Sequence, residues 1–68
     1  MSFIVVELQK NKDGVVSNIV TSFEAQSSAE SKYHSILAAA AVSELPVHSA
    51  ALLTEEGFSL MHQCYKHV

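Results

Sequence analysis

The chain has only two glycines, and each follows residues that favour a tight turn. Gly14 ends the segment Asn11-Lys12-Asp13-Gly14, and Gly57 ends Thr54-Glu55-Glu56-Gly57. Glycine adopts the positive φ that closes short hairpin loops, and Asn and Asp tolerate such turns. Apolar segments lie on both sides of each turn, so the sequence predicts one β-hairpin near each end of the chain.

The four predicted strands are rich in β-branched and aromatic residues, which favour extended structure. They cover residues 3–8 and 15–23 in the first hairpin, and residues 47–53 and 58–65 in the second. The third strand has the weakest β signal because it contains two alanines.

A helix is predicted between the hairpins. Ser27 as N-cap and Glu30 three residues later form a capping box, in which each side chain bonds a free backbone N–H. The helix is expected to end near Ser43, because Pro46 cannot continue it. Residues at steps of three and four give one apolar face: Ala29, Tyr33, Ile36, Leu37 and Ala40. Lys32, Ser35 and Ala39 are expected on the opposite side.

The predicted fold is therefore a single small α+β domain over residues 1–68, with two β-hairpins flanking one helix (ββαββ) and a sheet plus helix in two layers. A strand–helix–strand crossover within one sheet is almost always right-handed and joins strands that run parallel, here the second and third. The strand order stays open.

Two arguments predict a homo-oligomer. A chain of 68 residues has a marginal core, and its one cysteine, Cys64, cannot form an intrachain disulfide. Charged residues make up 16%, against about 25% in an average domain. One helix covers one face of a sheet, yet both faces are apolar.

The predicted interface residues are Phe3, Val5, Val16, Val20, Ala38, Ala39 and Ala41. The small residues 38–41 fit either a helix–helix contact or tight helix–sheet packing.

The charge and hydropathy of the chain limit the classes of partner that we expect it to bind. The formal net charge is −3 and the four cations are scattered lysines, with no arginine. Nucleic-acid binding depends on clustered cations and arginine forks, so no nucleic-acid partner is expected. No basic leader or long apolar segment is present, so no membrane partner is expected either. Together with the unpaired Cys64, these features indicate a cytoplasmic protein.

The residue types that carry chemistry do not form a known catalytic motif. There is no G-x-S-x-G turn or glycine-rich phosphate loop, so we expect no enzyme, no catalytic residues and no cofactor. His62 and Cys64 would share one face of a strand, but two ligands do not make a closed zinc site, so no metal is predicted.

Four residues are the candidates for ligand binding: Tyr33, His34, His48 and Ser49. His48 and Ser49 follow Pro46 at the helix–strand junction, where they fit either an anion or substrate contact or an interaction with the helix end. Tyr33 fits either the core or a ligand site between subunits.

One resemblance covers nearly the whole chain. The residues are KYHSILAAAAVS at 32–43, PVHSA at 46–50 and EEG at 55–57, with the opening strand and its Asp13-Gly14 turn. Here the chain resembles a group of short proteins encoded by phages and prophages of Gram-positive gut-type bacteria. The group has no established activity, so the resemblance implies no site residues. It implies a phage accessory protein that acts by binding.

Three functions follow as expectations. The first is a non-enzymatic, homo-oligomeric phage accessory protein that inhibits a host defence or regulatory protein, with Asp13 and Glu55-Glu56 available to a basic partner. The second is a sponge for a small molecule such as a signal nucleotide, bound between subunits. The third is a minor structural or assembly protein.

Overall fold

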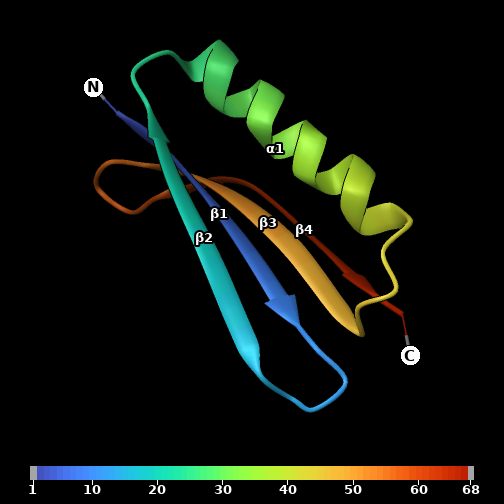
Figure 1. Cartoon of the computed structure of the whole chain (residues 1–68). Coiled ribbons are helices and arrows are strands. Elements are labelled where there is room, and N and C mark those ends of the chain that lie inside the picture. Colours follow the sequence, from blue (N-terminus) through green and yellow to red (C-terminus); the bar gives the residue numbers. More distant parts are fainter. Residues whose placement is uncertain (1, 68) are drawn as a thin grey trace.

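The computed structural model describes residues 2–67 as one sheet covered by one helix (Figure 1). The strands are Phe3–Lys10 (β1), Val16–Phe23 (β2), Val47–Thr54 (β3) and Ser59–Lys66 (β4), and the helix is Gln26–Ala41 (α1). This confirms the predicted α+β class and the order ββαββ. The observed bounds differ from the predicted ones by one or two residues: β1 continues to Lys10 and β3 to Thr54, β2 begins one residue later than predicted, and β4 is shifted by one residue.

The sheet has the order β2-β1-β3-β4, and every neighbouring pair is antiparallel. The strands β2 and β3 point in the same direction, as expected for the crossover, but β1 lies between them. The central strands are therefore β1 and β3, whereas β2 and β4 form the two edges (Figure 1).

The two turns have matching hydrogen bonds. The Gly14 N–H donates to the Asn11 carbonyl, and the Gly57 N–H donates to the Thr54 carbonyl. In each turn the side chain of the first residue also accepts from the backbone: Asn11 Oδ1 from Val15 N–H, and Thr54 Oγ1 from Phe58 N–H. Both glycines have positive φ, 85° and 94°, so the predicted turn chemistry is present.

The predicted capping box is wrong. The helix begins one residue before Ser27, and its N-cap is Ala25, whose backbone is extended and whose side chain makes no capping bond. The reason is the short connection from β2, which ends at Phe23, to the helix. The Ala29 N–H donates to the Ala25 carbonyl at 3.2 Å, so Ser27 already lies within the first turn, and Ala29 is fully buried. No helix within residues 2–67 is long and apolar enough to span a lipid bilayer.

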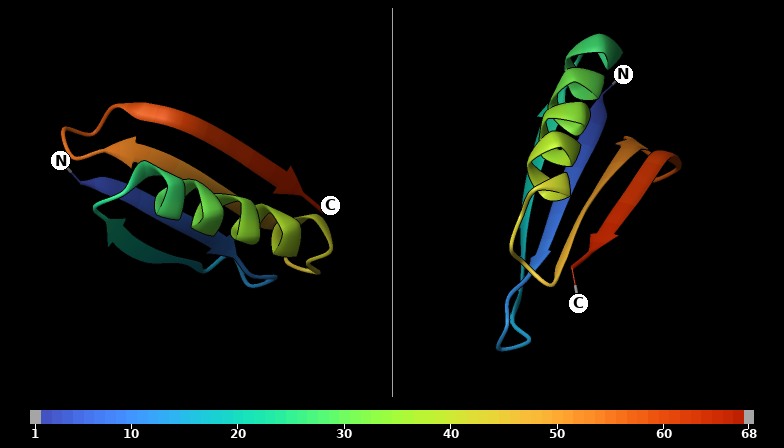
Figure 2. Two further views of the ribbon diagram at one scale, coloured as in Figure 1. Left: turned by 90° about the horizontal axis from the view of Figure 1, so that it is seen from above. Right: turned by 90° about the vertical axis from the view of Figure 1, so that its right-hand side faces the viewer.

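The core lies between α1 and the central strands. Figure 2 shows from two sides that the helix lies along one face of the sheet. The helix contributes Ala29, Tyr33 and Ile36, and the sheet contributes Val5, Ala50 and Leu52. Phe3, Phe23, Leu37 and Met61 pack around this cluster. The predicted apolar face of the helix is therefore the buried one. The molecule is thin, with an extent of 14 Å along its shortest axis.

Candidate functional site

The sheet face opposite the helix, which we call the open face, carries several exposed apolar side chains. The strand registers arrange its side chains in four rows across β2, β1, β3 and β4. These rows are Val16–Lys10–Val47–Lys66, Asn18–Leu8–Ser49–Cys64, Val20–Val6–Ala51–His62 and Ser22–Ile4–Leu53–Ser59. The only charged residues in these rows are Lys10 and Lys66, and both lie in the first row. The other three rows contain no acidic residue, lysine or arginine.

Several side chains of the open face are large, apolar and accessible. Val16 and Val20 are each 60% exposed, and Leu8 is 39% exposed. Leu60, next to Ser59, is the extra residue of a β-bulge that interrupts the β3–β4 register. An exposed contiguous apolar patch on a small protein marks an interaction surface more often than a scatter of single residues does.

The predicted interface residues fall on different surfaces. Val16 and Val20 lie on the open face and are exposed. Val5 is 1% exposed in the core beneath the helix, and Phe3 packs against that core, so neither belongs to the open face. Ala38, Ala39 and Ala41 lie on the outer side of α1, away from the sheet.

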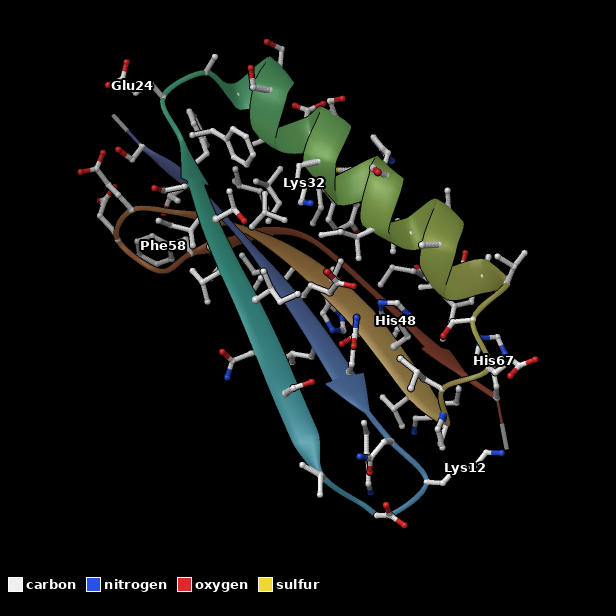
Figure 3. All side chains as sticks on the ribbon, in the orientation of Figure 1. Lys12, Glu24, Lys32, His48, Phe58 and His67 are labelled. Carbon is white, nitrogen blue, oxygen red and sulfur yellow. The ribbon has the colours of Figure 1, made fainter. Side chains whose placement is uncertain are left out.

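On the helix side of the sheet, Glu7 and His48 form a buried pair. His48 Nε2 lies 2.6 Å from Glu7 Oε2, and His48 is 4% exposed (Figure 3). His48 lies opposite Gln9, so Glu7 is its diagonal neighbour across β1 and β3, within reach of a long side chain. A carboxylate only accepts hydrogen bonds, so Nε2 carries the proton that His48 donates. The other ring nitrogen, Nδ1, is buried and has no partner among the described residues.

The surroundings of Glu7 favour its ionised form. Burial acts to raise the pKa of Glu7, but the hydrogen bonds from His48 and Gln9 and the nearby charges of His48 and Lys32 outweigh it. The pKa of Glu7 is therefore below its ordinary value of 4.5. Burial also raises the pKa of Tyr33, helped by the neighbouring Tyr65.

This shift predicts a loss of stability in acid. Glu7 binds a proton less tightly in the folded than in the unfolded chain, so its contribution is present above pH 4.5 and lost as the pH falls through its folded pKa. We expect the free energy of unfolding to fall as the pH drops below about 5, and to fall less steeply in Glu7→Gln. Urea unfolding at several pH values measures both slopes. Parallel slopes would show that Glu7 carries none of the dependence.

The four predicted ligand residues do not converge. Tyr33 and His48 are buried on the helix side, whereas Ser49 is 5% exposed on the open face. His34 is exposed on the helix, with its ring edge-on to Tyr33 at 5.4 Å. The histidine at the helix end is His67, whose Nε2 donates to the Ala40 carbonyl at 2.8 Å (Figure 3). His48 contacts Glu7 instead.

The described residues form neither a metal centre nor a pocket. His62 and Cys64 share the open face, as expected from their spacing. Within residues 2–67, no group of three or more His, Cys, Asp or Glu side chains is placed to hold a metal ion. The same residues enclose no pocket.

Glu7 is the residue that the sequence reasoning missed. Strand alternation places it on the same face as Phe3 and Val5, which is the apolar face that meets the helix. A carboxylate on a buried face needs a hydrogen-bonding or charged partner. Applied to Glu7, this rule would have pointed to a pair on the neighbouring strands.

Comparisons with protein-family models, with curated proteins and with solved structures found no significant match to this chain.

Proposed function

We propose that this protein is a small, non-enzymatic binding protein that works as a homo-oligomer, with the open face of one copy packed against that of a second copy. The observation that carries the proposal is the open face itself. Three of its four rows contain no acidic residue, lysine or arginine, and its valines and leucines are accessible to solvent.

The size of the open face supports a second copy as its occupant. The two longer dimensions of the molecule, 37 and 19 Å, bound a surface on the order of 700 Å². A stable protein interface buries about 800 Å² on each partner. Full overlap of two open faces would therefore approach the area of an ordinary stable interface, with the two sheets packed as a β-sandwich.

The arrangement of polar groups also supports self-packing. The open face has lysines at one end only, Lys10 and Lys66, so two copies can meet over the three uncharged rows with both lysines near the rim. Interfaces of homodimers have this pattern of an apolar, charge-depleted centre and a polar rim.

The finer part of the proposal is a phage accessory role in a bacterial cytoplasm, where the oligomer inhibits a host defence or regulatory protein. The resemblance of residues 32–43 and 46–50 to short phage proteins supports it. Native mass spectrometry of the protein purified from its host tests this part. One host protein bound in fixed stoichiometry would support inhibition. Extra small-molecule mass without a host protein would contradict inhibition and favour the sponge.

The open-face interface predicts a strong effect of Ala51→Lys. Ala51 lies in the middle of the open face, between Val6 and His62. Lysine there extends into solvent in the single chain but becomes a buried, unpaired charge when two faces meet. We expect the dissociation constant of the face-to-face contact to rise at least about 100-fold. Sedimentation velocity over a series of micromolar concentrations measures the change.

Val42→Lys is the matched control. Val42 is 82% exposed at the end of α1, far from the open face, so the same charge there should leave assembly unchanged. A wild-type protein that stays folded and monomeric at tens of micromolar would contradict the proposal. Equal effects of the two lysines would also contradict it, because they would show that position on the molecule does not matter.

A further inference from the structure

The free edge of β2 is a second unpartnered surface, separate from the open face. All residues from Val16 to Val20 are exposed, including Ile19, which lies on the helix side of the sheet and is 52% exposed. The helix lies mainly over β1 and β3, so it leaves this part of the first hairpin uncovered (Figures 1 and 2). This edge therefore presents apolar side chains on both sides of the strand.

The hairpin turn determines which backbone groups of β2 point outward. The Asn11 N–H donates to the Val15 carbonyl at 3.0 Å, so these two residues form a hydrogen-bonded pair. Such pairs alternate with non-hydrogen-bonded pairs along an antiparallel ladder. Ser17, Ile19 and Thr21 therefore bond to β1. The N–H and C=O groups of Val16, Asn18, Val20 and Ser22 point to the free edge.

The other edge of the sheet is protected, whereas β2 is not. A β-bulge at Leu60 interrupts the register of β4, and Lys66 lies at the end of that strand. Bulges and lysines are the usual devices that prevent an edge strand from pairing with another chain. The strand β2 has eight residues without a bulge, a proline or a charge. An edge of this kind is expected to be covered in the working protein.

We propose that the β2 edge pairs antiparallel with the β2 edge of a second copy, joining two four-stranded sheets into one continuous sheet. A register centred on Asn18 pairs Val16 of each copy with Val20 of the other and places the two Asn18 side chains opposite each other. All of these residues have outward-facing backbone groups, so each pair is a hydrogen-bonded pair. The inference extends the proposed homo-oligomer, but it uses a different surface.

Charge complementarity favours a second copy over a foreign strand. Lys12 lies at the tip of the first hairpin and Glu24 follows its other end, so the two residues mark opposite ends of β2 (Figure 3). The register centred on Asn18 brings the hairpin tip of each copy, which carries Lys12, toward the end of β2 that precedes Glu24 in the other copy. With Lys10 and Asp13, the residues around the tip carry a net charge of about +1 at neutral pH, which attracts Glu24.

Hydrogen exchange measured by NMR on the full chain tests the edge contact directly. In the associated protein, we expect the amides of Val16, Asn18 and Val20 to exchange at least about tenfold more slowly than in dilute protein. The amides of Ser17, Ile19 and Thr21 are the internal control, because β1 holds them in either state. If the outward amides exchange fast at every concentration, the inference is overturned. The β2 edge would then be a site for a strand of a different protein.

Variants separate this edge from the open face. Ile19→Lys adds a charge at the edge and leaves the open face intact, and Asn18→Pro removes an outward N–H without removing a bond to β1. With both surfaces in use, Ala51→Lys still forms edge dimers and Ile19→Lys still forms face-to-face dimers. The double variant Ile19→Lys/Ala51→Lys is then monomeric in sedimentation. If Ala51→Lys alone gives monomers, the edge inference fails. If Ile19→Lys alone gives monomers, the open-face proposal fails and the edge inference stands.

A charge swap tests the register. We expect Glu24→Lys in the Ala51→Lys background to raise the dissociation constant of the edge dimer by up to about tenfold, because the pair occurs twice in a symmetric dimer. Lys12→Glu/Glu24→Lys should restore it to within about twofold. Failure of the swap to restore association would exclude the register centred on Asn18.

Discussion

Leu52→Ala is expected to lower the free energy of unfolding by about 2–5 kcal/mol. Leu52 is fully buried on the helix side of β3, between Val5 and Met61 on the neighbouring strands. Tyr33 and Ile36 of the helix belong to the same core cluster. Truncation removes apolar contacts and leaves a cavity that a sheet packed against a helix cannot fully close.

The effect is large relative to the whole stability. A chain of 68 residues has a total free energy of unfolding of about 3–10 kcal/mol, so this one change removes much or all of it. Urea unfolding followed by far-UV circular dichroism measures the loss. The unfolding experiment should use the lowest workable protein concentration, because association also stabilises the folded state.

Leu53→Ala is the matched control for this prediction. Leu53 is the same residue type on the next position of the same strand, but it faces the open side of the sheet and is only half-buried. In dilute protein its truncation should cost much less than that of Leu52. At higher concentration it should weaken association. Equal costs in dilute protein would contradict the assignment of the core to the helix side.

The elements were predictable because local signals and tertiary packing agree. Both hairpins follow from glycines whose positive φ the turns require, and the helix face follows from the spacing of Tyr33, Ile36 and Ala40. The helix start was not predictable from Ser27 and Glu30, because the burial of Ala29 and the short connection from Phe23 outweigh a side-chain cap. The strand order depends on whether β1 or β2 of the first hairpin also pairs with β3. No local feature of the sequence indicates which of the two does so.

The candidate site was predictable only in part. Alternation along β1 gives two apolar faces, and the structure places Val5 beneath the helix and Val6 on the open face. Which face the helix covers depends on packing rather than on pattern. Alternation alone separates His48 from Ser49, because neighbours on a strand point to opposite faces. The residues proposed together for a ligand therefore lie on different sides of the sheet.

The Glu7–His48 pair predicts strong coupling between two substitutions. Glu7→Leu leaves the buried His48 ring without its acceptor, and His48→Leu leaves the Glu7 carboxylate without its principal donor. Each change removes a hydrogen-bond partner from a largely buried polar group, which costs about 1–3 kcal/mol. The double variant Glu7→Leu/His48→Leu strands neither group and places apolar side chains beside the core.

We therefore expect the double variant to lose less stability than the sum of the single variants, with a coupling of about 0.5–3 kcal/mol. Urea unfolding of the wild type, the two single variants and the double variant measures this coupling. It is done at neutral pH, where Glu7 is ionised. Phe58→Ala serves as a distant control, because Phe58 is 69% exposed in the turn between β3 and β4, beyond the end of β3 opposite to His48. It should combine additively with each single variant.

The cycle also decides what this pair does. A double variant at least as stable as the wild type would mean that the pair serves mainly to select the β1–β3 register, since a slip of one residue would turn Glu7 to the open face. Stabilities that simply add, within about 0.5 kcal/mol, would contradict the pairing itself. His48 would then be a buried histidine held by packing alone, and the acid sensitivity assigned to Glu7 would need another carboxylate.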